Sequence, residues 1–189
     1  TVTGSCYLLQ TDDAKVLIDC GMFQGSKTER ELNNRKFPFD PASLDAMLLT
    51  HAHIDHTGMI PKLVKHGFTK KIHCTKATVD LCSVMLPDSG FIQETDAKFK
   101  NQRKLKRGLQ EVEPIYSLED AMKALEHFQR LEYETWMGPA KGIRARWWNA
   151  GHLLGSASIE VEVAQAGKPA TRILFSGDIG PDHKMLEPD

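Results

Sequence analysis

Three histidines and an aspartate lie within a span of six residues, directly after a short apolar segment. The motif is T-H-A-H-I-D-H-T-G, and its polar members are His51, His53, Asp55 and His56. Side chains alternate along a strand, so the apolar segment 46–50 places His51 and His53 on one side, and the turn that follows brings the other two beside them. Imidazole nitrogens and carboxylate oxygens are ligands of Zn²⁺, and a site without thiolates that leaves a position open to water is catalytic. The motif therefore predicts a catalytic metal site rather than a solvated, histidine-rich turn.

Three other polar residues follow apolar segments in the same way. His152 stands in N-A-G-H-L-L-G-S-A, Asp178 in I-L-F-S-G-D-I-G, and Asp19 in V-L-I-D-C-G. A single His or Asp at such a place is more often a satisfied polar residue or the start of a turn. Beside the histidine motif, however, His152 and Asp178 become candidate ligands. Asp19 becomes a candidate for orienting a histidine ligand. It would do so by a hydrogen bond to the ring nitrogen that does not bind the metal.

Strands and helices that alternate along the chain must position these residues. Short apolar runs predict strands at 6–10, 15–19, 46–50, 71–74, 143–149, 157–164 and 171–176, the first two as a hairpin. Helical spacing predicts a short helix that begins near residue 60, a second over 77–86 and a third from residue 117. Residues 21–41 have no clean period and are expected to form a long loop. This order favours an α/β or α+β fold in which helices cover sheets.

The composition describes a globular chain of one domain. It has 189 residues, 41% of them hydrophobic, with 24 basic and 25 acidic side chains and a net charge of −1. This balance excludes a uniformly basic nucleic-acid binder, so any polyanion has to be bound locally. No apolar run approaches the ~20 residues of a membrane-spanning helix, so we expect no membrane partner.

A basic segment at residues 96–108 is the strongest local bias of charge. It is either a solvated helix or a mobile excursion, and it also offers cationic contacts to a polyanion. Its basic residues are Lys98, Lys100, Arg103, Lys104, Lys106 and Arg107.

The four cysteines form no C-x-x-C pair, and no signal peptide precedes them. We therefore expect reduced thiols in a cytoplasmic protein. The chain opens on a strand-like segment without Met, and we expect that it continues at both ends.

Taken in order, Asp19, the histidine motif, His152 and Asp178 resemble the first four motifs of the metallo-β-lactamase fold superfamily. The phrases V-T-G-S-C, L-I-D-C-G-M-F-Q-G, H-A-H-I-D-H-T-G, A-G-H-L-L-G-S-A and F-S-G-D-I-G are most similar to its β-CASP branch of RNA-processing nucleases, such as the RNase J-type enzymes and the endonuclease of mRNA 3′-end formation. The resemblance covers essentially the whole chain. It implies an incomplete αββα four-layer sandwich, with residues 1–189 as the N-terminal portion of the domain and the β-CASP cap and C-terminal completion beyond residue 189.

The resemblance also assigns roles to residues. It implies two Zn²⁺ ions, with Mn²⁺ as an alternative metal, and Asp178 as the ligand that bridges them. Asp55 and Asp178 would position the nucleophile, and Asp19 would keep the histidines in the right tautomer. A further ligand histidine of the family lies near the end of the complete domain, and His183 is too close to Asp178 to replace it. The ligands of the first ion would be His51, His53 and His152, and those of the second Asp55 and His56.

The function that the resemblance implies is a zinc-dependent phosphodiesterase that cleaves RNA with a water activated by two metals, as an endonuclease or a 5′-to-3′ exonuclease. The partner would be single-stranded RNA, held in part by the six basic residues of segment 96–108. A homodimer through regions outside this chain is left open. Without the cap, residues 1–189 alone are expected to be inactive. Two alternatives stay open: a hydrolase of a small thioester or lactone with the same metal motif, and a non-catalytic RNA-processing scaffold, which is expected to have lost metal ligands.

Overall fold

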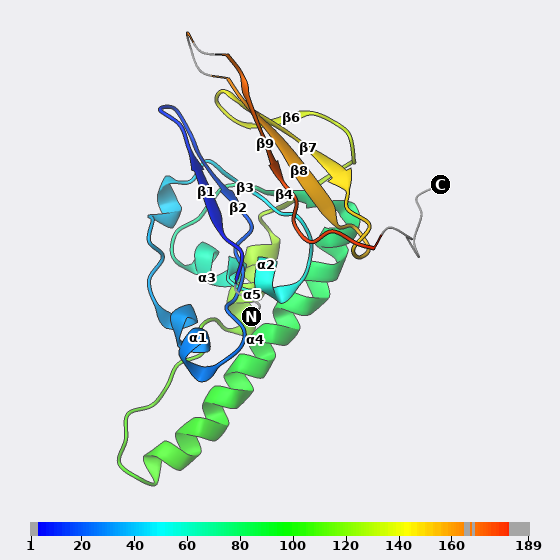
Figure 1. Cartoon of the computed structure of the whole chain (residues 1–189). Helices are drawn as coiled ribbons and strands as arrows, with labels where there is room; N and C mark the ends of the chain where they lie inside the picture. The colour runs from blue at the N-terminus through cyan, green and yellow to red at the C-terminus, as the bar shows by residue number, and fades with distance from the viewer. Residues whose placement is uncertain (1–3, 165–166, 168, 182–189) are drawn as a thin grey trace.

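Two β-sheets packed face to face form the centre of the molecule in the computed structural model, which describes residues 4–164, 167 and 169–181 (Figure 1). The strand order is β1-β2-β3-β4-β5 in the first sheet and β6-β7-β8-β9 in the second. The first sheet contains β1 (Tyr7–Gln10), β2 (Lys15–Ile18), β3 (Ala46–Leu48), β4 (Ile72–Thr75) and β5 (Phe128–Leu131). The second contains β6 (Met137–Ala140), β7 (Ile143–Asn149), β8 (Ala157–Val163) and β9 (Thr171–Phe175).

The helices pack on the face of the first sheet that points away from the second sheet (Figure 1). They are α1 (Lys27–Glu31), α2 (Ile54–Thr57), α3 (Ile60–Lys65), α4 (Lys76–Leu105) and α5 (Leu118–Leu125), with short 3₁₀ turns at Leu32–Asn34 and Pro41–Ser43. Among the described residues, no helix is both long enough and apolar enough to cross a membrane.

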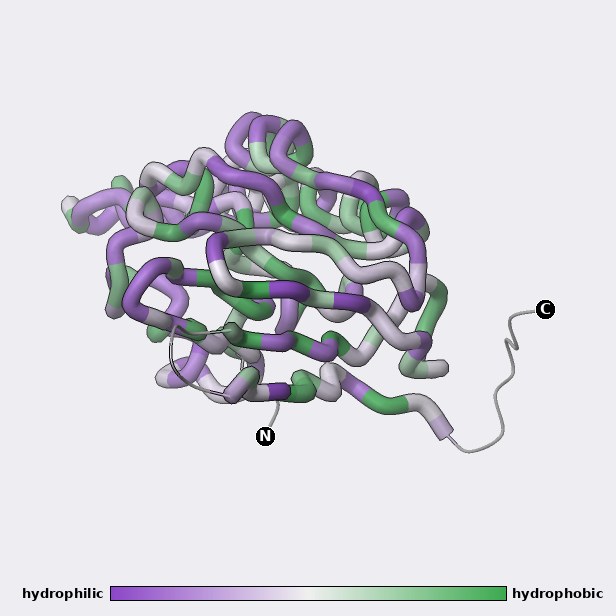
Figure 2. The backbone as a smooth tube through the Cα atoms, turned by 90° about the horizontal axis from the view of Figure 1, so that it is seen from above, coloured by the Kyte–Doolittle hydropathy of each residue, from purple (hydrophilic) through white to green (hydrophobic). Residues whose placement is uncertain are grey.

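Alternation along the central strands creates two cores. On β2, Leu17 packs with the helices, whereas Val16 and Ile18 pack against the second sheet. On β3, Met47 and Leu48 divide in the same way. Strands buried on both faces read as continuous apolar runs, which explains why these segments are the clearest strand signals in the sequence. Other strands instead alternate hydrophilic and hydrophobic residues along their length, as the colours of Figure 2 show.

The strand directions bring the ends of several strands to one edge. β2, β3, β4 and β5 are parallel neighbours, so the residues that follow them emerge on the same side. In the second sheet β8 is antiparallel to both β7 and β9, so β7 and β9 also end together. The backbone amide of Ala157 donates to the carbonyl of Thr50 at 2.9 Å and joins the edges of the two sheets. The loops that carry the predicted ligands therefore meet at this edge.

The outer face of the second sheet carries charged pairs in place of helices. In β7 and β8 the inward residues are apolar, and outward Arg144 and Arg146 stand opposite Glu162 and Glu160. The mixed α/β fold is confirmed, and the described residues form three of the four predicted layers. A helical layer over the outer face of β6–β9 is not formed by residues within this described part.

The structure corrects three of the expected elements. The expected loop 21–41 contains α1, whose capping box joins Ser26 and Glu29. The helix expected over 77–86 and residues 96–105 of the basic segment are one helix, α4, which continues through Pro87. Its middle was missed because proline and glycine are poor helix formers, yet Gly90 lets α4 approach the N-terminus of α5: a Cβ at this glycine would lie 2.8 Å from the carbonyl oxygen of Ser117. The helix expected from residue 117 ends at Leu125, and Phe128 begins β5, a strand that is not predicted from the sequence.

Candidate metal centre

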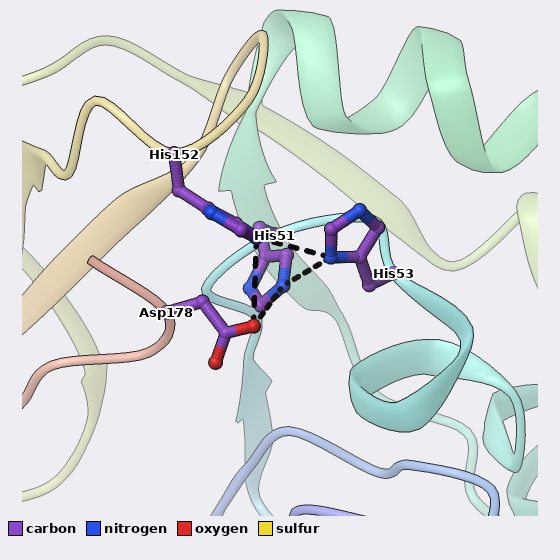
Figure 3. A group of neighbouring side chains, drawn as sticks. All are labelled: His51, His53, His152 and Asp178. Carbon is purple, nitrogen blue, oxygen red and sulfur yellow. Dashed lines mark hydrogen bonds and ion pairs between the residues drawn. The ribbon is translucent and has the colours of Figure 1, made fainter. Parts of the chain in front are cut away.

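Four side chains from three separate loops point toward a common centre (Figure 3). His51 and His53 follow β3, His152 lies between β7 and β8, and Asp178 follows β9. His53 Nδ1 lies 3.2 Å from both His51 Nε2 and His152 Nε2. Asp178 Oδ2 lies 3.7 Å from His51 Nε2 and 3.4 Å from His152 Nε2. His51 and Asp178 are more than a hundred positions apart in the sequence, and the strand edges bring them together.

The spacing of these four atoms suits ligands of a single metal ion. Ligand atoms at the ~2.0–2.1 Å typical of zinc lie about 3.3–3.4 Å apart when they are arranged tetrahedrally. Four of the six separations, 3.2, 3.2, 3.4 and 3.7 Å, are close to that value, and all four ligand atoms lie within 4.8 Å of one another. Three imidazole nitrogens that face one point cannot satisfy one another fully by hydrogen bonding, since each neutral ring carries only one proton. The donor set and its geometry thus suit a divalent cation.

Asp178 also belongs to a second group of candidate ligands. Its Oδ1 lies 3.4 Å from His56 Nε2, which in turn lies 3.8 Å from Asp55 Oδ2. Asp55, His56 and Asp178 together form a group with ligand atoms close enough to hold one ion. The two carboxylate oxygens of Asp178 therefore face different groups, which is the arrangement of a bridging ligand.

A buried carboxylate behind the cluster fixes the histidine rings. Asp19 is only 1% exposed, and its Oδ2 accepts a hydrogen bond from His56 Nδ1 at 2.7 Å. The amide and hydroxyl of Thr50 also donate to Asp19, each at 2.8 Å. Because the Thr50 hydroxyl proton points to Asp19, its oxygen is free to accept from His51 Nδ1, 3.0 Å away. Both rings are then oriented with Nε2 toward the cluster.

The backbone of Asp19 is itself unusual. Its φ of 56° lies in the left-handed region, which a residue other than glycine rarely adopts. Such backbone strain is concentrated at functional sites, where the surrounding structure holds it in place. The strain and the hydrogen bonds together place the Asp19 carboxylate as a positioning group behind the ligands.

Burial tunes the charge of the cluster. Burial lowers the pKa of His51 to about 3, and the charges of His56 and the other imidazoles act in the same direction. His51 is therefore neutral, as a metal ligand must be. Burial alone would lower the pKa of His56, but the hydrogen bond and charge of Asp19 outweigh it and raise that pKa. Burial also raises the pKa of Asp19, against the hydrogen bonds that it accepts.

Hydrogen bonds to serine and glycine shape the loop that carries His152. Ser156 is fully buried, and its Oγ accepts from the backbone amides of His152 at 3.0 Å and Leu153 at 3.1 Å. The carbonyl of Gly155 in the same loop accepts hydrogen bonds from the hydroxyls of Thr75 at 2.7 Å and Thr78 at 2.9 Å. The loop is thereby tied to the N-terminus of α4.

Close backbone packing holds the segment that carries Asp55. A Cβ added at Gly21 would lie 1.6 Å from the carbonyl oxygen of Asp55, so only glycine fits there. The amide of Ser5 also donates to this carbonyl at 2.7 Å. The segment from Asp19 to Gly21 therefore supports both the ring of His56 and the backbone of Asp55.

The structure brings the six predicted ligands into two adjoining groups, with Asp19 directly behind them. It does not bring the basic residues of segment 96–108 there: they lie at the opposite end of α4 (Figure 1). His183 lies outside the described residues.

Thr50 and Gly21 were not singled out from the sequence. Their positions in the sequence could have identified them, because Thr50 lies between β3 and the first histidine and Gly21 lies two residues after Asp19.

The fold and the site define a mixed α/β protein with two stacked sheets and a histidine and aspartate cluster at the ends of their strands. The sequence pattern described as "Metallo-beta-lactamase superfamily" matches residues 1–189. The chain belongs to the metallo-β-lactamase superfamily, as the motifs predict.

Comparison with individual proteins shows that the chain is similar to a ribonuclease and to a transcription termination factor. The chain is 39% identical over 188 residues to "Ribonuclease TTHA0252" of Thermus thermophilus, covering 100% of this chain and 38% of that protein. It is 31% identical over 186 residues to "Transcription termination factor FttA" of Methanococcus maripaludis, covering 97% of this chain and 27% of that protein. The chain thus spans well under half the length of either relative. Among solved structures, a B3 metallo-β-lactamase with an active-site glutamic acid has a TM-score of 0.54 at 18% identity, covering 92% of this chain and 56% of the other, which shows the fold alone.

Replacing Asp19 by Asn is expected to weaken metal binding by about 10- to 100-fold, the usual effect of removing a partner of a ligating histidine. The amide can place only one acceptor oxygen where the carboxylate receives three donors, so either His56 or Thr50 loses its bond. Competition against a chelator of known affinity, in the complete protein, measures the change. Asp12→Asn, at an exposed site, is the matched control. Equal affinities in the two variants would contradict the positioning role.

Proposed function

We propose that the complete protein is a metal-dependent phosphodiesterase of the β-CASP branch that hydrolyses single-stranded RNA in the cytoplasm. The observation that carries this proposal is the pair of ligand groups joined by Asp178, in a chain 39% identical to a protein named as a ribonuclease. Zn²⁺ is the metal that the N and O donors favour, with Mn²⁺ as the alternative.

The proposed ligands of the first ion are His51, His53, His152 and Oδ2 of Asp178, and those of the second are Asp55, His56 and Oδ1 of Asp178. A pair of bound divalent ions would lower the pKa of a water toward neutrality and offset the charge that develops on the scissile phosphate.

The residues of this chain have defined tasks in that reaction. Asp178 fixes the relation between the two ligand groups, because each of its oxygens faces one of them. The carboxylates of Asp55 and Asp178 would offset part of the positive charge and position the attacking water. Asp19 holds His56 with Nε2 directed into the site and touches no substrate. In-line attack on a phosphodiester is the reaction that such a centre supports best.

Chelation provides the direct test. The complete protein is incubated with end-labelled single-stranded RNA and with DNA of the same sequence, before and after removal of metal and after its return. We expect cleavage of RNA that is lost on chelation and restored by Zn²⁺ or Mn²⁺. The lengths of the products distinguish internal cutting from stepwise trimming.

The remaining outcomes decide against the proposal. A protein that holds two metals yet cleaves neither RNA nor DNA would favour the hydrolase of a small thioester or lactone. A folded protein with negligible metal would favour the scaffold, although all ligands expected in the described residues are present.

A further inference from the structure

The C-terminal part of α4 concentrates positive charge on an otherwise acidic chain. We call residues 97–110 the basic arm. Its six basic residues are Lys98, Lys100, Arg103, Lys104, Lys106 and Arg107, and it lies between the acidic residues Asp96 and Glu111. The whole chain has a net charge of −1, so the rest of the chain carries −1 − 6, or −7. Such separation of charge creates a local positive potential.

These cations face solvent and are free of ion pairs within the described residues. Five of the six are exposed, and Lys104 is partly exposed. Figure 1 shows this end of α4 reaching beyond the body of the molecule, with the chain returning alongside it. The side chain of Asn101 clamps the returning segment, donating to the carbonyl of Val112 at 2.9 Å and accepting from its amide at 2.8 Å. These two hydrogen bonds hold the returning segment against α4.

One face of the arm combines cations with an exposed aromatic ring. Phe99 and Arg103 stand at helix positions i and i+4 of α4, so they share a face, with Lys100 beside it. Lys106 caps the C-terminus of α4 in a helical conformation, and Arg107 lies in the turn that follows. The side chain of Phe99 is 64% exposed, which nothing in the packing of the core requires. Lys98 instead lines the groove between α4 and the returning segment. A ring for base stacking among cations for phosphates is the surface that binds single-stranded nucleic acid.

α4 connects this face directly to the metal centre. Thr75, which caps the N-terminus of α4, and Thr78 in its first turn hold the loop of His152 through the carbonyl of Gly155. Over the 30 residues of α4, a rise of 1.5 Å per residue gives a length of about 45 Å. A strand stacked at about 3.4 Å per nucleotide would need roughly 13 nucleotides to cover that length.

We propose that Phe99, Lys100, Arg103, Lys106 and Arg107 form a second RNA-binding site, which holds the substrate strand about 10–13 nucleotides from the bond that is hydrolysed. This inference rests on the proposed function for the identity of its ligand. It predicts that long RNA binds through the arm, whereas very short RNA reaches the metal centre without it.

The test removes four charges from the arm of the complete protein. The variant Lys100→Gln, Arg103→Gln, Lys106→Gln, Arg107→Gln is compared with a matched control, Arg30→Gln, Lys36→Gln, Lys70→Gln, Lys71→Gln, which loses equal charge from exposed sites elsewhere. Binding of a 25-nucleotide single-stranded RNA is measured against salt concentration, in a His53→Ala background that prevents cleavage. Each phosphate contact on a single strand contributes about 0.7 to the slope of log K against log salt, so the arm variant should lose about 2.8.

A second measurement examines the role of length. In the protein with intact ligands, the arm variant should lower kcat/KM for the 25-nucleotide RNA at least tenfold and leave that for a tetranucleotide unchanged. Phe99→Ala should weaken binding of single-stranded RNA about fivefold or more.

Each outcome has one meaning. A salt slope equal to that of the control overturns the second site, even if the protein cleaves RNA. A reduced slope in a protein that cleaves no RNA supports the arm as an RNA contact and rejects the proposed function instead. A variant that loses binding to polyglutamate but not to RNA would assign the arm to an acidic protein and overturn the proposal.

Discussion

Replacement of Asp178 by Ala is expected to lower kcat/KM of the complete protein for RNA by about 10³-fold or more. The reason is that this single carboxylate serves both ligand groups, with Oδ2 3.4 Å from His152 Nε2 and Oδ1 3.4 Å from His56 Nε2. Stabilisation of transition-state charge by bound metals amounts to several kcal/mol, and about 4 kcal/mol corresponds to 10³ in rate. Elemental analysis should show metal lost from both groups in the same variant.

Two comparison variants sharpen this expectation. Asp178→Asn keeps one oxygen and should retain more metal than Asp178→Ala. His66→Ala removes a histidine outside both ligand groups, whose ring nitrogen instead bonds the carbonyl of Lys62, and should retain full metal content. Retention of two metals by Asp178→Ala would show that this carboxylate is not a shared ligand.

The ligands of the candidate site were predictable from sequence because each follows an apolar strand. Parallel strands end at a common edge, so polar residues at those ends meet even when they are far apart in the chain. The position of Thr50 was not predictable, because its role depends on Asp19 from another strand. The same holds for Gly21, where the constraint is a carbonyl oxygen of Asp55 that only the folded chain places beside it.

The fold shows the same division between local and tertiary information. β7 and β8 were predictable because apolar residues alternate with polar or charged ones over the first five positions of β7 and over all seven of β8. β6 contains Gly138 and Pro139, which are poor strand formers, and it forms only because it pairs with β7. The length of α4 was hidden for a similar reason, since packing against α5 maintains the helix through Pro87 and Gly90.

Trp147→Ala is expected to reduce the free energy of unfolding by about 3–5 kcal/mol, the range for removing a large aromatic side chain from a core. Trp147 is fully buried between the two sheets among apolar residues of β2, β3, β7 and β8. Its Nε1 also donates to the carbonyl of Leu49 at 3.0 Å, two residues before His51. Urea unfolding of the complete protein, followed by circular dichroism, measures the loss.

The neighbouring tryptophan provides the matched control. Trp148 points to the opposite face, where it is half-buried beneath the guanidinium of Arg146 and donates from Nε1 to Glu160. Because an exposed cation–π contact contributes only about 0.5–1 kcal/mol, Trp148→Ala should destabilise the protein far less than Trp147→Ala. Trp147→Phe should fall between them, since it keeps most of the volume but leaves the Leu49 carbonyl without its donor. Equal losses at the two tryptophans would mean that the space between the sheets is not the core that holds the strand ends, and with them the ligands, in place.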